Sequence, residues 1–386
     1  MNKVKKVCVI TGTRAEYGIL FNTLKELKKS KKINLQIIAS GTHMERSYGL
    51  TYKLIENDGF IIDKKVKIIK NSKEDSDFEI AKITSLAVYK FALAFKKLKP
   101  DLILVVGDRY EILAAAVAAT LLKIPIAHIH GGEATEGLID EAIRHSITKM
   151  SHLHFVSTKI YKNRIEQMGE NPKNIFHVGA PGLENLKKVK LLKRNECEKI
   201  LGFKFKKKNI LVTFHPVTLE KNTSKKYFLK ILSALNKIKD TMIILTKSNA
   251  DSDNVIINKL IDKFVKENKN AVSYKSLGTV KYLSVLKIVD ILIGNSSSGI
   301  IEAPSCGAIT INLGDRQKGR VKSKSVIDCK IEEKDILEKI RICFKMKKKR
   351  IKNLYYKKNT SQNIVKVIEN TNFERILKKK FFDYKI

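Results

Sequence analysis

The feature of this chain that most constrains its fold is a regular alternation of short apolar runs with longer amphipathic segments. The apolar runs, such as Val7–Ile10 and Leu102–Val106, are rich in β-branched residues, and amphipathic stretches such as Phe78–Leu98 separate them. Strands that alternate with helices in this way are typical of parallel sheets with helices on both faces. The sequence therefore predicts the α/β fold class.

The alternation occurs in two blocks, which predicts two Rossmann-like domains facing a cleft. Strands of the first block are expected at Val7–Ile10, Leu35–Ala39, Leu102–Val106, Ile126–Ile129, Leu153–Val156 and Ile175–Val178. Strands of the second are expected at Ile210–Phe214, Met242–Thr246, Val272–Tyr274, Ile291–Gly294 and Ile309–Leu313. A polar, lysine-rich stretch, Gly179–Lys207, is expected to be a linker plus the entry to the second domain. We expect domains at residues 1–182 and 183–365, and a basic C-terminal helix at 366–386 that packs back on the first domain.

The charge of the chain bears on its partners. The formal net charge is +37, which by itself is typical of nucleic-acid binding. Only 11 of the 76 basic residues are arginine, however, and arginine is the residue that most nucleic-acid readers use. The lysines are spread along the whole length, so we expect solvated surfaces, no nucleic-acid partner, and a preference for an anionic substrate.

Cysteine usage and hydropathy indicate a cytoplasmic protein without a membrane partner. The five cysteines are scattered and form no C-x-x-C motif, which is typical of reduced thiols. The N-terminal apolar run is too short for a signal peptide, and the longest apolar run, Ile112–Leu122, is too short to span a bilayer.

Polar motifs follow the first two expected strands. In TGTRAEYG, Gly12 permits a tight turn, and the turn carries Arg14 and Glu16. A G-x-G-x-x-G fingerprint is absent. Either Arg14 and backbone N–H groups clamp an anion, or the turn is a capped helix start in which Arg14 pairs with Glu16. His43, in GTHM, either faces the cleft or is structural.

The stretch from Asp108 to Ser151 concentrates acids and bases. Asp108 directly follows an apolar strand and is a candidate general base or ribose ligand; the alternative is a helix N-cap. His128 and His130 share one face of a strand, but with Glu133 they are a weak metal signal. We expect one histidine to pack against the sheet, while the two glycines of HGGE let the backbone approach a sugar.

Asp140 and Arg144 are spaced i, i+4 on a helix. They form either a simple salt bridge, or a pair in which Arg144 keeps Asp140 ionised as a base or contacts a leaving phosphate.

The second block carries a different cluster. His215, in FHPVT, ends a strand and suits acid–base work or phosphate contact, unless it is simply buried. In GNSSSG, Ser296 and Ser297 precede a helical run and suit a diphosphate, unless they are ordinary caps. Glu302 is placed to accept ribose hydroxyls, and Arg316, in GDRQKGR, to cover the phosphates.

Together these motifs resemble the UDP-N-acetylglucosamine 2-epimerase family over nearly the whole chain. The matching segments are TGTRAEYG, GTHM, GDRYE, HIHGGE, DEAIRHSITKMSHLHF, FHPVT, SNAD, GNSSSGIIE and LGDRQKGR. The DEAIRHSITK segment is similar to the hydrolysing branch, whereas the non-hydrolysing branch typically has H-V-E-A-G-L-R in place of HIHGGE. The resemblance implies a GT-B fold with UDP in the cleft, a homo-oligomer (dimer or tetramer), and no metal or other cofactor.

The resemblance also implies a reaction. UDP-N-acetylglucosamine and water would give UDP and N-acetylmannosamine through a glycal, for sialic acid biosynthesis. The alternative substrate is UDP-2,4-diacetamido-2,4,6-trideoxyglucose (UDP-N,N'-diacetylbacillosamine), for legionaminic acid, and the motifs do not separate the two. A non-hydrolysing epimerase or a GT-B glycosyltransferase is less favoured.

Site residues follow from the resemblance by position. Catalytic or sugar-contacting positions are matched by Asp108, Asp140, Arg144 and His215. Positions that bind UDP are matched by Arg14, Arg109, Ser296, Ser297, Glu302 and Arg316. To these we add Glu16 for UDP and His43 for the sugar. Some hydrolysing relatives have Glu where this chain has His130, so either Glu133 substitutes or His130 itself is the acid or base; both are kept as catalytic candidates.

Overall fold

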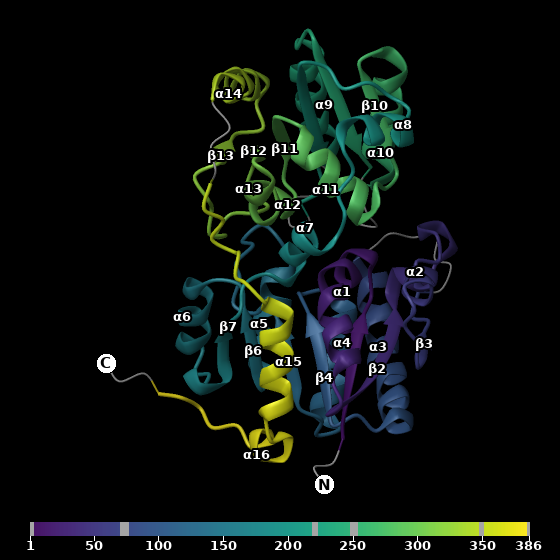
Figure 1. Ribbon diagram of the computed structural model, residues 1–386, viewed down its shortest axis with the longest axis vertical. Coiled ribbons are helices and arrows are strands. Elements are labelled where there is room, and N and C mark those ends of the chain that lie inside the picture. The colour runs from purple at the N-terminus through teal and green to yellow at the C-terminus, as the bar shows by residue number, and fades with distance from the viewer. Residues whose placement is uncertain (1–3, 70–76, 218–222, 248–253, 347–350, 384–386) are drawn as a thin grey trace. The chain divides into compact units, whose positions relative to one another are not determined.

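The computed structural model describes residues 4–69, 77–217, 223–247, 254–346 and 351–383 (Figure 1). The chain divides into two compact units. Unit 1 comprises Met1–Glu133, Asp140–Glu184 and Tyr355–Ile386, and unit 2 comprises Ala134–Ile139 and Asn185–Leu354. No described helix combines the length and the apolar character needed to cross a membrane.

Unit 1 is built on a seven-stranded parallel sheet with the order β3-β2-β1-β4-β5-β6-β7. The strands are β1 (Lys5–Thr11), β2 (Ile33–Ser40), β3 (Lys64–Val66), β4 (Leu102–Val106), β5 (Ile126–Ile129), β6 (Leu153–Val156) and β7 (Ile175–His177). In the register of the sheet, Val7 of β1 lies between Leu35 of β2 and Leu102 of β4. The strand order reverses between β1 and β4, and ligands of open α/β sheets bind beside such a reversal.

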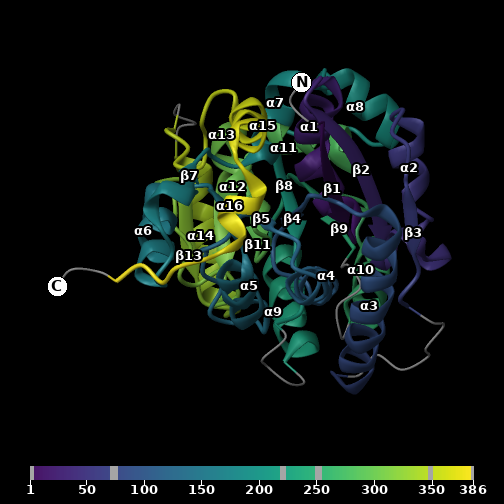
Figure 2. The same cartoon turned by 90° about the horizontal axis from the view of Figure 1, so that it is seen from below.

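Helices cover both faces of this sheet because alternate strand residues point to opposite sides. The helices are α1 (Arg14–Lys29), α2 (Tyr52–Asn57), α3 (Asp77–Leu98), α4 (Tyr110–Leu121), α5 (Asp140–Met150), α6 (Lys159–Gln167), α15 (Thr360–Asn370) and α16 (Phe373–Leu377). Val7 and Val9 share a core with α1 and α15, whereas Cys8 and Ile10 share a core with α3 and α4. Figure 2 shows α3 beside α4.

Unit 2 repeats this plan with a six-stranded parallel sheet of order β10-β9-β8-β11-β12-β13. The strands are β8 (Lys208–Thr213), β9 (Thr241–Thr246), β10 (Ala271–Tyr274), β11 (Ile291–Gly294), β12 (Ile309–Leu313) and β13 (Val326–Cys329). The helices are α7 (Asn185–Lys188), α8 (Arg194–Leu201), α9 (Ser224–Asn236), α10 (Asn254–Glu267), α11 (Gly278–Ile288), α12 (Ser298–Ile301), α13 (Ala303–Cys306) and α14 (Glu333–Lys345). Here the order reverses between β8 and β11.

The stretch Gly179–Lys207, expected as a linker plus the entry to the second domain, is mostly folded structure of unit 2. It contains α7 and α8, and α8 buries Cys197 in the core of that unit. The edge strands β3 and β13 were not predicted, because they are short and charged residues interrupt their apolar pattern. The domain ranges 1–182, 183–365 and 366–386 stay a prediction about which parts of the chain fold as units. In the structure, the chain from Tyr355 onward packs as part of unit 1.

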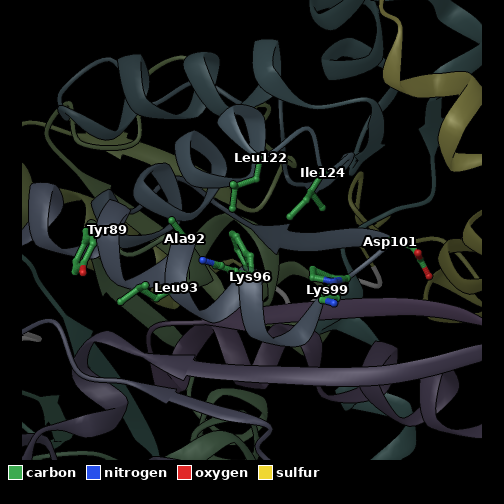
Figure 3. A pocket seen from close by; sticks show the side chains of 10 residues that line it. Tyr89, Ala92, Leu93, Lys96, Lys99, Asp101, Leu122 and Ile124 are labelled. Atoms are coloured by element: carbon green, nitrogen blue, oxygen red, sulfur yellow. The ribbon is translucent and has the colours of Figure 1, made fainter.

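A surface cavity of about 520 Å³ lies in unit 1 between the ends of α3 and α4 (Figure 3). Its walls are mainly apolar and include Tyr89, Leu93 and Leu122. Asp101 and Ile124 mark its position at the amino ends of β4 and β5. The cavity therefore lies at the edge of the sheet opposite to the carboxyl ends that carry the candidate site residues.

Candidate active site

The centre of the site in unit 1 is the guanidinium of Arg144, on α5. Its side chain is 1% exposed. Nε donates to Oδ2 of Asp108 (2.9 Å), and Nη1 donates to Oε2 of Glu141 (2.7 Å) and to the carbonyl of Glu133 (3.1 Å). A buried cation is tolerated only with such partners. Arg144 therefore ties the end of β4, the HGGE loop and α5 into one charged cluster.

Asp108 lies at the carboxyl end of β4, beside the reversal of strand order. The N-cap of α4 is Arg109, without a side-chain cap bond, so the carboxylate of Asp108 is directed to Arg144 and does not cap the helix. The structure shows an ion pair of Arg144 with Glu141, at i, i+3. The pairing with Asp140, at i, i+4, stays a prediction. Asp140 is the first residue of α5 and is half-buried.

The two histidines at the end of β5 have different surroundings. His128 is fully buried, and its Nε2 donates to the carbonyl of Gly107 (2.7 Å); burial lowers its pKa to about 3. His130 lies beyond the strand, with 11% of its side chain exposed, and its Nδ1 lies 2.7 Å from Oε1 of the buried Glu133. Ser157, directly after β6, donates to the same oxygen (2.7 Å). His128 is thus structural, and His130 remains available for chemistry.

The loop after β1 holds the candidate anion contacts of unit 1. The hydroxyl of Thr13 caps α1 by accepting from the N–H of Glu16 (3.2 Å), and Oε2 of Glu16 accepts from the N–H of Gly12 (2.7 Å). Glu16 is therefore a capping residue in this structure. Arg14 makes no ion pair in the described part of the chain, which leaves its guanidinium available for an anion.

A second buried carboxylate, Glu111, packs against this loop. Its Oε1 accepts from Nε of Arg109 (2.9 Å), and a Cβ on Gly12 would lie 2.6 Å from the Glu111 side chain. Burial, with repulsion from Glu111 added, raises the pKa of Glu16 to about 8. The position of Arg109, another predicted UDP contact, is thus set by Glu111.

His43 is fully buried and both of its ring nitrogens have partners. Nε2 lies 3.0 Å from the hydroxyl of Thr11, and Nδ1 lies 2.8 Å from that of Thr51. Burial lowers its pKa to about 4. This environment favours a structural role over the expected sugar contact.

In unit 2 the site surrounds Asn295, which directly follows β11 and is fully buried. Its side chain accepts from the N–H of His215 (2.8 Å) and donates to the carbonyl of His215 (2.7 Å). Its own carbonyl accepts from Arg316 Nη1 and from Gln317 Nε2, both at 3.0 Å. Asn295 therefore brings His215 and Arg316 together beside the strand reversal of this sheet.

The serines of GNSSSG form a hydroxyl cluster next to Asn295. The hydroxyl of Ser298 donates to Oγ of Ser296 (3.2 Å) and contacts the phenol of Tyr282. Ser297 is the N-cap of α12, and Glu302 lies between α12 and α13. The segment Ala134–Ile139 also belongs to unit 2, where the N–H of Glu136 donates to the carbonyl of Lys318 (3.2 Å).

Some residues of this site were not predicted as functional. Glu141, Ser157 and Asn295 are polar residues at the edge of a predicted strand or helix, so a signal was present. The partners of Ser157 and Asn295 are distant in sequence, whereas Glu141 pairs with Arg144 three positions later. The motif SNAD and Thr218 of FHPVT lie outside the described residues. Within the described residues, no group of three or more His, Cys, Asp or Glu side chains is placed to hold a metal ion.

Comparison with known proteins identifies the family. The sequence profile of the UDP-N-acetylglucosamine 2-epimerase family matches residues 25–369. The chain is 41% identical to the GDP/UDP-N,N'-diacetylbacillosamine 2-epimerase (hydrolyzing) of Campylobacter jejuni, covering 98% of this chain and 99% of the relative. It is 40% identical to polysialic acid biosynthesis protein P7 of Escherichia coli, covering 99% and 97%. It is 35% identical to the UDP-N,N'-diacetylbacillosamine 2-epimerase (hydrolyzing) of Legionella pneumophila, covering 95% and 96%.

A solved structure shares the fold. The UDP-GlcNAc 2-epimerase from Neisseria meningitidis, bound to UDP-GlcNAc, matches with a TM-score of 0.82 and 21% identity, over 95% of this chain and 100% of that chain. The predicted fold class, two Rossmann-like α/β halves of GT-B type, is confirmed. The chain therefore belongs to the UDP-N-acetylglucosamine 2-epimerase family and is a hydrolysing UDP-sugar 2-epimerase.

Proposed function

We propose that the substrate is UDP-2,4-diacetamido-2,4,6-trideoxyglucose, which gives the 2-epimeric free sugar and UDP. Two hydrolysing relatives, at 41% and 35% identity, carry the name of this substrate. UDP-N-acetylglucosamine, the substrate that the family resemblance put first, becomes the second candidate and is favoured by the polysialic acid relative at 40% identity.

The proposed reaction has two steps. A base removes the proton at sugar C2, the electrons of the C2–H bond form a C1=C2 double bond, and the C1–O bond breaks with its electron pair on UDP. Water then adds across the double bond, with the hydroxyl at C1 and a proton delivered to the opposite face of C2. This chemistry requires proton-transfer groups near the sugar and cations near the departing diphosphate.

The observation that carries the proposal is the Arg144 cluster in unit 1. It holds Asp108 and the HGGE loop at the carboxyl ends of β4 and β5, where open α/β sheets bind ligands. We assign proton transfer to this cluster and to Asp140, with a supporting role for His215 in unit 2. We assign UDP binding to Arg14 and Arg109 in unit 1 and to Ser296, Ser297, Glu302 and Arg316 in unit 2.

The test is to incubate the protein separately with both UDP-sugars and with GDP-linked diacetamido sugar, and to identify the released monosaccharide by NMR. We expect faster release from the UDP-diacetamido sugar, with deuterium at C2 of the product when the solvent is deuterated water. Faster release from UDP-N-acetylglucosamine would replace the first candidate with the second. Retention of the original hydrogen at C2 would exclude the elimination path.

The UDP-binding assignment is tested separately. Ser297→Ala combined with Glu302→Ala is expected to weaken UDP binding by at least about tenfold, because hydrogen bonds to charged groups are lost. Isothermal titration with UDP measures the affinity, and Ser233→Ala, on α9, serves as a control. An unchanged affinity would remove both residues from the UDP site. The homo-oligomer and the cytoplasmic location stay proposals, which light scattering and cell fractionation would test.

A further inference from the structure

We propose that His130 takes the proton from sugar C2, with Nε2 as the reacting atom, and that Glu133 and Ser157 hold the imidazole in position. The inference rests on the proposed elimination reaction. It chooses between the two alternatives that the sequence left open, and it adds Ser157 as a positioning residue.

The hydrogen bonds define the state of the imidazole. Oε1 of Glu133 lies 2.7 Å from Nδ1 of His130, so Nδ1 carries the hydrogen and Nε2 presents its lone pair. No described residue forms a hydrogen bond with Nε2, and the side chain is only partly exposed. Glu133, which is 1% exposed, cannot reach a substrate as easily as His130 can. Its carboxylate is placed to balance the positive charge that the imidazole gains when Nε2 accepts a proton.

The backbone around His130 is folded tightly to make this contact. His130 adopts φ +67°, which non-glycine residues rarely adopt and which is typical of functional sites when the surroundings enforce it. A Cβ on Gly132 would lie 2.8 Å from the carbonyl of Tyr161 and 2.6 Å from Ile165. The two glycines thus let the loop turn back so that Glu133 reaches a residue three positions earlier.

Charged groups from two helices fix the loop. Arg144 of α5 donates to the carbonyl of Glu133 (3.1 Å), and Arg164 of α6 donates to the carbonyl of Gly132 (2.7 Å). Asp108, from the end of β4, pairs with Arg144. These contacts hold the loop by its backbone, while the side chain of Glu133 bonds to His130 and Ser157.

The step is balanced as follows. Nε2 forms a bond to the C2 proton, the C2–H electrons become the C1=C2 bond, and UDP leaves with the electrons of the C1–O bond. The resulting imidazolium keeps its Nδ1–H bond to Glu133 and returns its new proton to solvent before the next turnover.

The first experiment removes the imidazole. His130→Gln is expected to lower kcat by about 10²- to 10⁴-fold, as for loss of a general base. His130→Gly, which suits the positive φ, is expected to regain activity when free imidazole is added. His177→Gln, a half-buried histidine at β7, is the matched control and should retain wild-type rates. Full activity in His130→Gln would overturn the proposal.

The second experiment distinguishes positioning from mere structure. Glu133→Gln is expected to lower kcat with little change in KM and to move the acid limb of the kcat/KM profile to lower pH, because a carboxylate no longer favours the imidazolium. Ser157→Ala is expected to lower kcat on the order of tenfold and to move that limb slightly to higher pH, because the carboxylate loses a donor. Ser151→Ala, another buried serine, is the control. A lower melting temperature with an unmoved acid limb in both variants would overturn the positioning roles.

A third measurement separates this inference from the proposed function. The isolated glycal is supplied to His130→Gln, which is expected to hydrate it at the wild-type rate because only elimination is impaired. If His130→Gln lost glycal hydration but kept elimination, the assignment of C2 proton removal to His130 would be overturned. If the wild-type protein releases no UDP from any UDP-sugar, the proposed function fails, whereas an active wild type with an equally active His130→Gln contradicts this inference alone.

Discussion

At the scale of single residues, the site depends on charges that the fold keeps away from water. Arg144 compensates its burial with two carboxylates and a carbonyl. Glu16 and Glu111 lack an equal supply of cations, and burial raises the pKa of Glu16 to about 8. Arg144 and the carboxylates around it therefore supply opposite charges to each other, whereas Glu16 favours its protonated form below about pH 8.

Glu16 makes stability depend on pH. Its pKa is about 8 in the fold and near 4.5 when unfolded, so the folded state binds the extra proton between these values. By linkage, its contribution to stability is present below about pH 4.5 and is lost as the pH rises to about 8, by at most about 1.4 kcal/mol per pH unit. Glu16→Gln keeps an acceptor for Gly12 and should remove this loss.

Urea unfolding at pH 5 and pH 8.5 measures the effect. Glu16→Gln should gain stability over the wild type at pH 8.5 relative to pH 5, whereas Glu374→Gln, an exposed residue of α16, should not. A difference between variant and wild type that does not change with pH would contradict the raised pKa of Glu16.

Asp108 is expected to be essential for turnover but not for folding. Asp108→Asn removes one charged partner of Arg144 but keeps an oxygen acceptor for Nε and Nη2, while Glu141 and the carbonyl of Glu133 still accept from Nη1. We expect kcat to fall by about 10²- to 10⁴-fold with UDP affinity preserved. Steady-state kinetics and UDP titration measure this, with Asp101→Asn at the other end of β4 as the control. A wild-type rate would exclude Asp108 from the chemistry.

The residue types of the site were predictable, but several of their pairings were not. Spacing along α5 predicts Asp140 as a partner of Arg144, because residues at i, i+4 share a helix face, and that pairing stays a prediction. Glu141, at i, i+3, shares it too, and the position of Asp108 at the end of β4 decides how the guanidinium turns. Such choices depend on a strand that is 36 residues away in sequence.

At the scale of elements, the site is formed where strands end beside a reversal of strand order. In unit 2, Gly294 closes β11 so near to β8 that a Cβ would lie 1.8 Å from the carbonyl of Thr213. That close approach allows Asn295 to reach His215. The end of β11 therefore admits only glycine.

Gly294→Ala is expected to destabilise unit 2 by more than about 3 kcal/mol, because a backbone carbonyl cannot yield as a side chain can. Gly202→Ala is the control, since that glycine also has positive φ but has open space around it, and should cost about 1 to 2 kcal/mol. Chemical denaturation of both variants measures the difference. Equal costs would show that the strand end can shift to accommodate a methyl group.

The central strands were predicted with the bounds that the structure shows at β4, β5, β6, β11 and β12. Strands buried on both faces must be continuously apolar, and that composition is visible in sequence. The strands β3 and β13 contain charged residues and are only partly buried, so their composition carries no such signal.

At the scale of the whole molecule, both ends of the chain build unit 1. After unit 2 the chain returns as α15, which packs on α1 (Figure 1). Thr360 donates to the carbonyl of Val178 (2.7 Å), and Ile364 and Ile368 are fully buried in the same core as Val7. The stability of unit 1 therefore depends on residues encoded after unit 2.

Ile364→Ala is expected to destabilise unit 1 by about 2 to 5 kcal/mol, the usual cost of a large cavity in a core. Ile160→Ala, on the exposed side of α6, should cost much less. Urea unfolding measures the loss of stability, and hydrogen exchange of the β1 and β4 amides in the native protein shows whether that loss lies in unit 1. Protection of those amides equal to the wild type would show that α15 is dispensable for this core.

The sequence by itself determined the fold class, the central strands and the chemical groups of the site, because periodicity and residue type are local properties. Only the tertiary structure decided which groups meet: Arg144 with Asp108, Glu133 with His130 and Ser157, and Asn295 with His215. Each of these pairs joins the ends of different elements or requires an unusual backbone turn, and the order of strands in the sheet sets those distances.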